Sequence, residues 1–156
     1  MGVSTAKGLC FGAGIPLLSA GTLDVLVSEA HRLGVVPEGC RAIVPMVDAR
    51  RMEVYAAVFT PDGKQLTETK PLVVDADSFA DELAEGPVLF IGDGALKCRE
   101  VLSSPNAFFA EAFPTAMAMA PLAEAAWNEK RLEDVAYFEP FYLTDFVATV
   151  SRKKLF

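Results

Sequence analysis

Two aspartates come after apolar runs that read as strands, and their carboxylates could bind divalent metal ions. Asp48 follows residues 43–47, and Asp93 follows residues 88–91. Carboxylates at the ends of neighbouring strands can hold two magnesium ions for hydrolysis. Glu82, in a predicted helix between the two runs, is a third candidate ligand. Aspartate is also a common turn residue, so a purely structural role is the competing interpretation.

The first aspartate begins a charged turn between two apolar runs. The second run, residues 53–59, is apolar on both faces, which predicts a strand covered on both sides. We expect the arginines of the turn to orient Asp48 and the neighbouring loops rather than to bind substrate. The hairpin residues of interest are Asp48, Arg50, Arg51, Glu53 and Tyr55, and the facing loop is Gly92, Asp93 and Gly94.

Other reactive side chains are few. The chain has one histidine, His31, so it supplies neither a histidine pair for a metal nor a choice of base for a serine triad. Its three cysteines are widely scattered, which argues against a disulfide framework or a clustered zinc site. No phosphate-binding loop of the Walker or dinucleotide type occurs. A peptidase therefore has little support in the sequence.

The amino-acid composition narrows the classes of protein to which the chain could belong. The chain has 156 residues, 52% of them hydrophobic, which suits a folded unit with a proper core. The net charge of −7 is unfavourable for direct nucleic-acid binding by this chain alone. No apolar run approaches the roughly 18 residues that would cross a bilayer, and residues 1–7 lack a signal-peptide layout. We therefore expect a cytoplasmic protein without a membrane segment.

The first predicted helix, residues 2–13, is rich in small residues. Glycine inside a helix costs about 0.5–1 kcal/mol relative to alanine, yet Gly8 and Gly12 lie four residues apart on one side. This spacing indicates that another element packs closely against the helix. Packing within the chain and packing against a partner are equally compatible with the pattern.

The remaining predicted elements follow in a regular order. Thr22 should cap a helix that ends at Gly34, and a connector follows at residues 35–41. From residue 42 we predict β-β-β-α-β-α-β-α, the order of the ribonuclease-H-like fold and of the actin-like, sugar-kinase (ASKHA-type) architecture. The predicted elements are strands 43–47, 53–59 and 64–74, a helix 78–85 capped by Asp77, strand 88–91, helix 95–103, strand 107–113 and a helix that Thr115 opens and that runs to 131.

This order divides the chain into three predicted parts. Residues 1–41 are expected to be the remnant of a first ASKHA half, with a helix, a short strand and a helix. Residues 42–133 form the ribonuclease-H-like half, and residues 134–156 are expected to pack back on the fold.

Five short motifs together resemble the TsaB (YeaZ) family. The most specific is the hairpin Asp48-Ala-Arg-Arg-x-Glu-Val-Tyr55, although Met52 stands where the family usually has glycine. The resemblance covers essentially the whole chain and implies that roughly the N-terminal third of the family's fold is missing. The other four motifs are Ala6-Lys7-Gly8-Leu9, Ile15-Pro16-Leu17, Gly92-Asp93-Gly94 and Glu139-Pro140-x-Tyr142-Leu143.

The resemblance implies a non-catalytic subunit in the formation of N6-threonylcarbamoyladenosine on tRNA. In that family the catalytic TsaD-type subunit is the partner, a TsaE-type ATPase takes part, and homodimers form. ATP and metal then belong to the partner subunits, and this chain has no catalytic or metal-binding residue of its own. Metal-dependent hydrolysis and glycoprotease-type peptidase activity are the alternatives. The partner contact implied by the resemblance is the first helix, with Ser4, Thr5, Gly8, Leu9 and Gly12.

Overall fold

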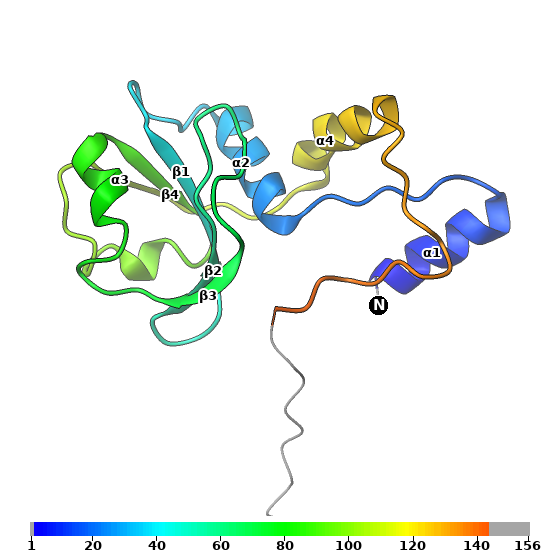
Figure 1. Ribbon diagram of the computed structural model, residues 1–156, viewed down its shortest axis with the longest axis horizontal. Helices are drawn as coiled ribbons and strands as arrows, with labels where there is room; N and C mark the ends of the chain where they lie inside the picture. Colours follow the sequence, from blue (N-terminus) through cyan, green and yellow to red (C-terminus); the bar gives the residue numbers. More distant parts are fainter. Residues whose placement is uncertain (1, 144–156) are drawn as a thin grey trace, which may run out of the picture.

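A five-stranded mixed sheet with helices on both sides forms the body of the protein (Figure 1). This computed structural model describes residues 2–143. The strands lie in the order β3-β2-β1-β4-β5. In chain order the elements are α1 (Gly2–Ala13), α2 (Thr22–Leu33), β1 (Ala42–Asp48), β2 (Glu53–Ala56), β3 (Lys70–Val73), α3 (Ala80–Glu85), β4 (Val88–Ile91), the 3-10 turn η1 (Leu96–Cys98), β5 (Ala107–Ala110) and α4 (Ala116–Asn128).

The strand directions confirm the predicted fold class. β1, β2 and β3 are antiparallel neighbours, while β4 runs parallel to β1 and β5 runs parallel to β4. A three-stranded meander followed by two parallel strands is the ribonuclease-H-like, ASKHA-type arrangement predicted from the element order. Because β1 and β4 are parallel neighbours, their carboxyl ends meet at the same edge of the sheet.

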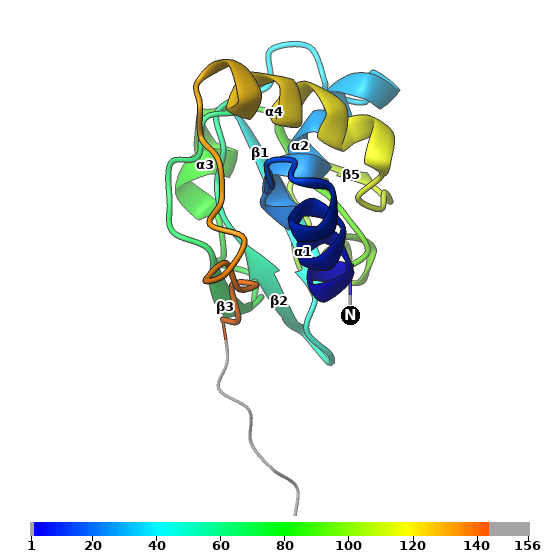
Figure 2. The ribbon, with the colours of Figure 1, turned by 90° about the vertical axis from the view of Figure 1, so that its right-hand side faces the viewer.

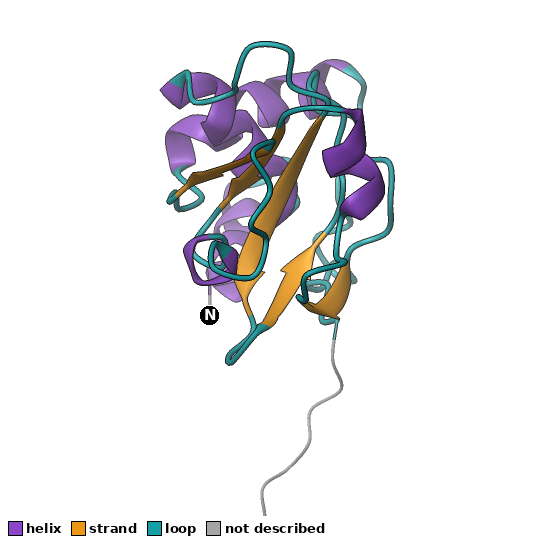
Figure 3. Ribbon diagram, turned by 90° about the vertical axis from the view of Figure 1, so that its left-hand side faces the viewer, coloured by secondary structure: helices purple, strands orange, loops and turns teal. Residues whose placement is uncertain are grey.

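Alternating residues of the central strands build two separate cores. On one face, Val44 and Phe90 pack with η1 and with the ring of Phe79 beside α3. On the other face, Ile43 and Leu89 pack with α2. Figure 3 shows helices on both sides of the sheet. All four residues of β4 are buried, as a strand covered on both faces requires.

The core extends across the boundary that the sequence places at residue 41. Leu26 and Ala30 of α2 are fully buried against β1 and β4, so α2 shares its core with the sheet. The predicted cap of this helix is wrong, because Gly21 takes the N-cap position and Thr22 is already helical. The predicted end is confirmed, since Gly34 adopts the left-handed conformation with φ 65°.

Several other predicted elements are shorter than expected, among them the strand predicted at 107–113, which ends at Ala110 as β5. The strand predicted at 64–74 is reduced to β3, an edge strand, and β2 ends at Ala56 although Phe59 still bridges to Ile43. The helix predicted at 95–103 contains only η1 and adjoining turns. Asp77 does not cap α3. Phe79 does so without a side-chain bond, at φ 62°, which lets its ring contact Phe90 at 5.4 Å.

The last helix, α4, is attached to α2 through a buried acid. Thr115 caps α4 as predicted, accepting a hydrogen bond from the Ala118 amide. Its hydroxyl in turn donates to Glu29 Oε2 at 3.0 Å, and Glu29 also pairs with Arg32 at 2.6 Å. Glu29 is only 3% exposed, so these partners compensate the burial of its charge. The α2–α4 pair therefore joins the sheet to the outer part of the molecule.

The outer part consists of α1 and a returning segment. Figures 1 and 2 show α1 standing apart from the sheet, with residues 134–143 running beside it. The short strand predicted near residue 17 is reduced to an isolated bridge between Leu17 and Glu133. Of the predicted C-terminal segment, residues 134–156, the part at 144–156 lies outside the residues that the structure describes. Within the described part, no helix has the length and apolar character to cross a bilayer.

Candidate functional site

Helix α1 has two different faces. Its inner face carries the half-buried residues Val3, Ala6, Lys7 and Cys10, whose spacing of three and four residues places them on one side. This side points toward the returning segment 134–143. The predicted interface residues are all exposed, and one of them, Ser4, also borders the cleft between this inner face and the returning segment: Ser4, Thr5, Gly8, Leu9 and Gly12.

Gly8 and Gly12 of α1 face open space. A Cβ atom built on Gly8 or Gly12 would meet no atom within 4 Å, apart from the helix's own backbone and chain neighbours. Packing within the chain, one of the two explanations for these glycines, is therefore wrong for the described residues. Leu9 is 67% exposed and Phe11 is 84% exposed, so large apolar side chains accompany the small ones. The helix thus presents an exposed apolar surface made of Gly8, Leu9, Phe11 and Gly12, which we call the outer face of α1.

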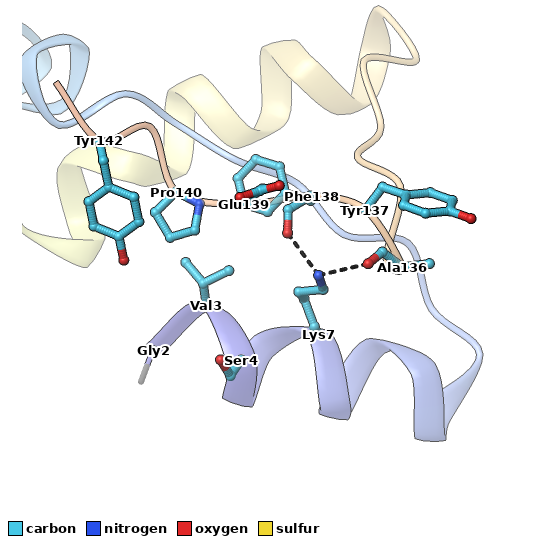
Figure 4. Close-up of a pocket in the computed structure, with 10 residues that line it drawn as sticks. All are labelled: Gly2, Val3, Ser4, Lys7, Ala136, Tyr137, Phe138, Glu139, Pro140 and Tyr142. Atoms are coloured by element: carbon cyan, nitrogen blue, oxygen red, sulfur yellow. Dashed lines mark hydrogen bonds between the residues drawn. The ribbon is translucent and has the colours of Figure 1, made fainter. Parts of the chain in front are cut away.

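The inner face of α1 is held by polar contacts. Lys7 Nζ donates to the carbonyl oxygens of Ala136 and Phe138, at 3.1 Å and 2.8 Å (Figure 4). A cleft of about 610 Å³ lies between this turn of the helix and the returning segment, with Val3 and Tyr142 on its walls. The family resemblance marks Lys7 only as part of a motif and gives it no role in holding the two segments together.

A second cleft, of about 690 Å³, lies between α1 and the sheet. Leu17, Val47, Tyr55 and Met119 contribute to its lining, together with the end of the returning segment. The predicted hairpin residue Tyr55 therefore faces the outer part of the molecule, whereas the charged tip of the hairpin lies beyond this cleft. The structure separates the residues that the sequence groups as one hairpin signature.

At the hairpin tip, Asp48 is bound by a lysine rather than by an arginine side chain. Lys97 Nζ donates to Asp48 Oδ1 at 2.5 Å and to the carbonyl of Glu53 at 2.6 Å. Arg50 contributes only its backbone amide, at 2.8 Å. The ammonium group holds the pKa of Asp48 below its usual value. The prediction that Arg50 and Arg51 orient Asp48 is therefore wrong for their guanidinium groups.

Lys97 is the residue that sequence reasoning missed. It follows the Gly92-Asp93-Gly94 loop by three residues and lies in η1, where the sequence predicts a regular helix. The sequence could have indicated Lys97, because β1 and β4 were expected to be neighbouring strands. Residues just after β4 should then lie close to the end of β1. A lysine in that position can neutralise an aspartate at the end of β1.

The glycine loop fits closely against the end of β1. Gly94 donates its amide to the Met46 carbonyl at 3.1 Å, and Asp93 Oδ1 accepts from the Asp48 amide at 3.0 Å. A Cβ on Gly92 would lie 2.2 Å from the Met46 oxygen, and its φ of 125° favours glycine. The Asp93 carboxylate thus ties two strands together through the backbone.

These contacts do not form a metal site. Asp93 and Asp48 do lie side by side, as predicted, but the described residues contain no cluster of three possible metal ligands. Glu82 lies on α3, which leads into the beginning of β4, whereas Asp93 follows the end of that strand. Lys97 already compensates the charge of Asp48. The arrangement stabilises a loop, and its Asp48 carboxylate is paired with Lys97.

Comparison with known proteins agrees with this fold. The profile of the family described as TsaD, tRNA N6-adenosine threonylcarbamoyltransferase, matches residues 1–151. No curated protein matches the sequence.

Two solved structures share the architecture. One is YeaZ from Pseudomonas aeruginosa, with a TM-score of 0.69 and 23% identity over 90% of this chain and 66% of that one. The other is described as an uncharacterized protein with similarity to peptidase YEAZ from Pseudomonas aeruginosa, with a TM-score of 0.71 and 22% identity over 92% of this chain and 66% of that one. This chain thus spans about two thirds of the length of either structure. The chain belongs to the tRNA N6-adenosine threonylcarbamoyltransferase (TsaD) family and is TsaB/YeaZ-like in its fold.

Proposed function

We propose that this chain is a non-catalytic partner subunit in the formation of N6-threonylcarbamoyladenosine on tRNA, and that it binds a TsaD-type catalytic subunit. The observation that carries the proposal is the outer face of α1. A Cβ atom on Gly8 or Gly12 would meet no atom within 4 Å outside the helix, and the large side chains of Leu9 and Phe11 are exposed. A surface of this kind suits close approach by a helix of another subunit.

The physical argument rests on the cost of the glycines. Each glycine inside an exposed helix destabilises that helix by about 0.5–1 kcal/mol relative to alanine. Nothing in the described chain offsets this cost at Gly8 or Gly12. A partner helix that packs on the glycines can approach closely enough to bury Leu9 and Phe11, and burial of such side chains is favourable by about 1.5–3 kcal/mol each.

The chemistry at the hairpin supports a non-catalytic role. Asp48 is paired with Lys97, and Asp93 accepts a backbone hydrogen bond. Among the described residues, no serine or cysteine is hydrogen-bonded to His31, the single histidine of the sequence. These observations give no support to the peptidase or the hydrolase alternative. In line with the family resemblance, we further propose that ATP and metal are bound by partner subunits, among them a TsaE-type ATPase.

Copurification tests the proposal directly. The chain, and a version extended to the length of its structural relatives, would be coexpressed with a tagged TsaD-type subunit. We expect a stable complex, and we expect loss of modified adenosine in tRNA when the gene is deleted. Failure to form the complex, together with normal tRNA modification in the deletion strain, would contradict the proposal. A homodimer of this chain would use the same outer face and would be seen by analytical ultracentrifugation.

A further inference from the structure

The inner face of α1 is attached to the returning segment mainly through polar contacts. Lys7 places its ammonium group between the carbonyl oxygens of Ala136 and Phe138, two residues apart on the same side of the segment (Figure 4). No carboxylate among the described residues forms an ion pair with Lys7. The hydrogen bonds are therefore charge-assisted on the donor side alone.

The returning segment is shaped to receive this lysine. Asp134 Oδ1 accepts from the amides of Ala136 and Tyr137, and its carbonyl accepts from the Phe138 amide at 2.8 Å. These bonds form a turn whose carbonyl groups at 136 and 138 remain available to an outside donor. Just before the turn, Glu133 donates its amide to the Leu17 carbonyl at 2.9 Å. The segment is thus anchored at its start and bound by Lys7 further along.

Helix α1 needs such an attachment to keep its position. It has 12 residues and none of them is buried. Isolated helices shorter than about 12–15 residues are marginal in water, and Gly8 and Gly12 weaken this one further. Apolar burial therefore contributes little to fixing α1, and specific hydrogen bonds on its inner face decide how it lies.

We propose that Lys7 is a positioning residue that fastens α1 to residues 134–140 and thereby keeps the outer face of α1 turned toward the partner subunit. This inference rests on the proposed function for the identity of the partner, but not for the attachment itself. Lys7 extends toward residues 136 and 138, whereas Gly8 and Gly12 face open space, so its substitution changes no atom of the two glycines.

Hydrogen exchange of the 156-residue chain tests the attachment without any partner. In Lys7→Met, peptides from residues 2–13 and 133–143 should exchange at least about tenfold faster, because the substitution removes both charge-assisted hydrogen bonds. Lys7→Arg should restore most of the protection. Lys64→Met is the matched control, because that side chain lies in an exposed turn without an ion pair among the described residues, and it should leave both peptides unchanged.

The possible results separate this inference from the proposed function. Unchanged exchange in Lys7→Met, with peptides of β1 and β4 protected as in the parent, would overturn the attachment. Faster exchange of the two peptides with undiminished binding to the TsaD-type subunit would overturn its role in presenting the outer face. Weaker binding with intact β1 and β4 would support it. Failure of the proposed function would show as absence of binding by the parent chain itself.

Discussion

A methyl group on Gly92 should strongly destabilise the sheet. This glycine begins the loop that follows β4, and its φ of 125° is sterically unfavourable for any other residue. The new Cβ of Gly92→Ala would lie 2.2 Å from the Met46 carbonyl oxygen, a backbone atom of β1 just past its pairing with β4. The loop would have to move away from the end of β1.

The geometry gives the size of the effect. An unfavourable backbone conformation costs about 1–3 kcal/mol. Movement of the loop also breaks the Gly94–Met46 and Asp48–Asp93 hydrogen bonds, each worth about 0.5–1.5 kcal/mol. We expect a total loss of about 3–5 kcal/mol in the free energy of unfolding, a large part of the roughly 5–15 kcal/mol typical of a domain.

Urea denaturation followed by circular dichroism measures this loss. With a slope of about 1–3 kcal/mol per molar urea, the midpoint of Gly92→Ala should fall by about 1–5 M. Gly8→Ala is the matched control, because its Cβ meets no atom within 4 Å and alanine favours the helix. It should not lower the midpoint. A Gly92→Ala protein within about 0.5 kcal/mol of the parent would refute the close approach of the loop to β1.

Three further substitutions test the polar contacts of the fold. Glu29→Gln should lower the free energy of unfolding by about 2–3 kcal/mol near neutral pH. Because Arg32 holds the pKa of Glu29 below its ordinary value, the difference from the parent should disappear as the pH falls through that lowered pKa. Denaturation at several pH values measures this difference. Lys97→Met should raise the pKa of Asp48 in a carboxyl NMR titration while costing less than about 1 kcal/mol, since Asp48 is half exposed. Thr115→Val should cost about 1 kcal/mol by removing the cap of α4, and an unchanged melting curve would contradict the capping role.

The strands could be predicted because burial on both faces leaves a clear pattern. Residues 43–47 and 88–91 are continuous apolar runs, and each became a central strand of the sheet. β3 lies at the edge of the sheet and carries Lys70 and Pro71, residue types that suit an edge strand. Thr115 was recognisable as a cap because threonine lies directly before an alanine-rich helix.

The secondary-structure predictions that are wrong lie where tertiary contacts override the conformational preference of the local sequence. Phe79 adopts the left-handed conformation at the start of α3 and its ring contacts Phe90 of β4, a long-range contact that the local sequence does not show. The regular helix predicted at 95–103 gives way to the turn η1, from which Lys97 reaches Asp48 and the Glu53 carbonyl.

For the candidate site, the sequence indicated a close-packed helix but could not say what it faces. The spacing of Gly8 and Gly12 fits contact within the chain as well as contact with a partner. Only the three-dimensional arrangement shows that both glycines face away from the rest of the chain. Lys7 was part of a family motif in the sequence, and its contacts with residues 136 and 138 became visible only because distant segments lie side by side.

Binding of a TsaD-type subunit to the outer face of α1 is the central claim, and isothermal titration calorimetry tests it most directly. Gly8→Leu places a large side chain on that face, whereas Ala84→Leu makes a similar change on the exposed side of α3. We predict that the parent and Ala84→Leu bind equally and that Gly8→Leu binds at least about tenfold more weakly, a loss of about 1.4 kcal/mol. Equal binding by Gly8→Leu and the parent would contradict the assignment of the interface to α1.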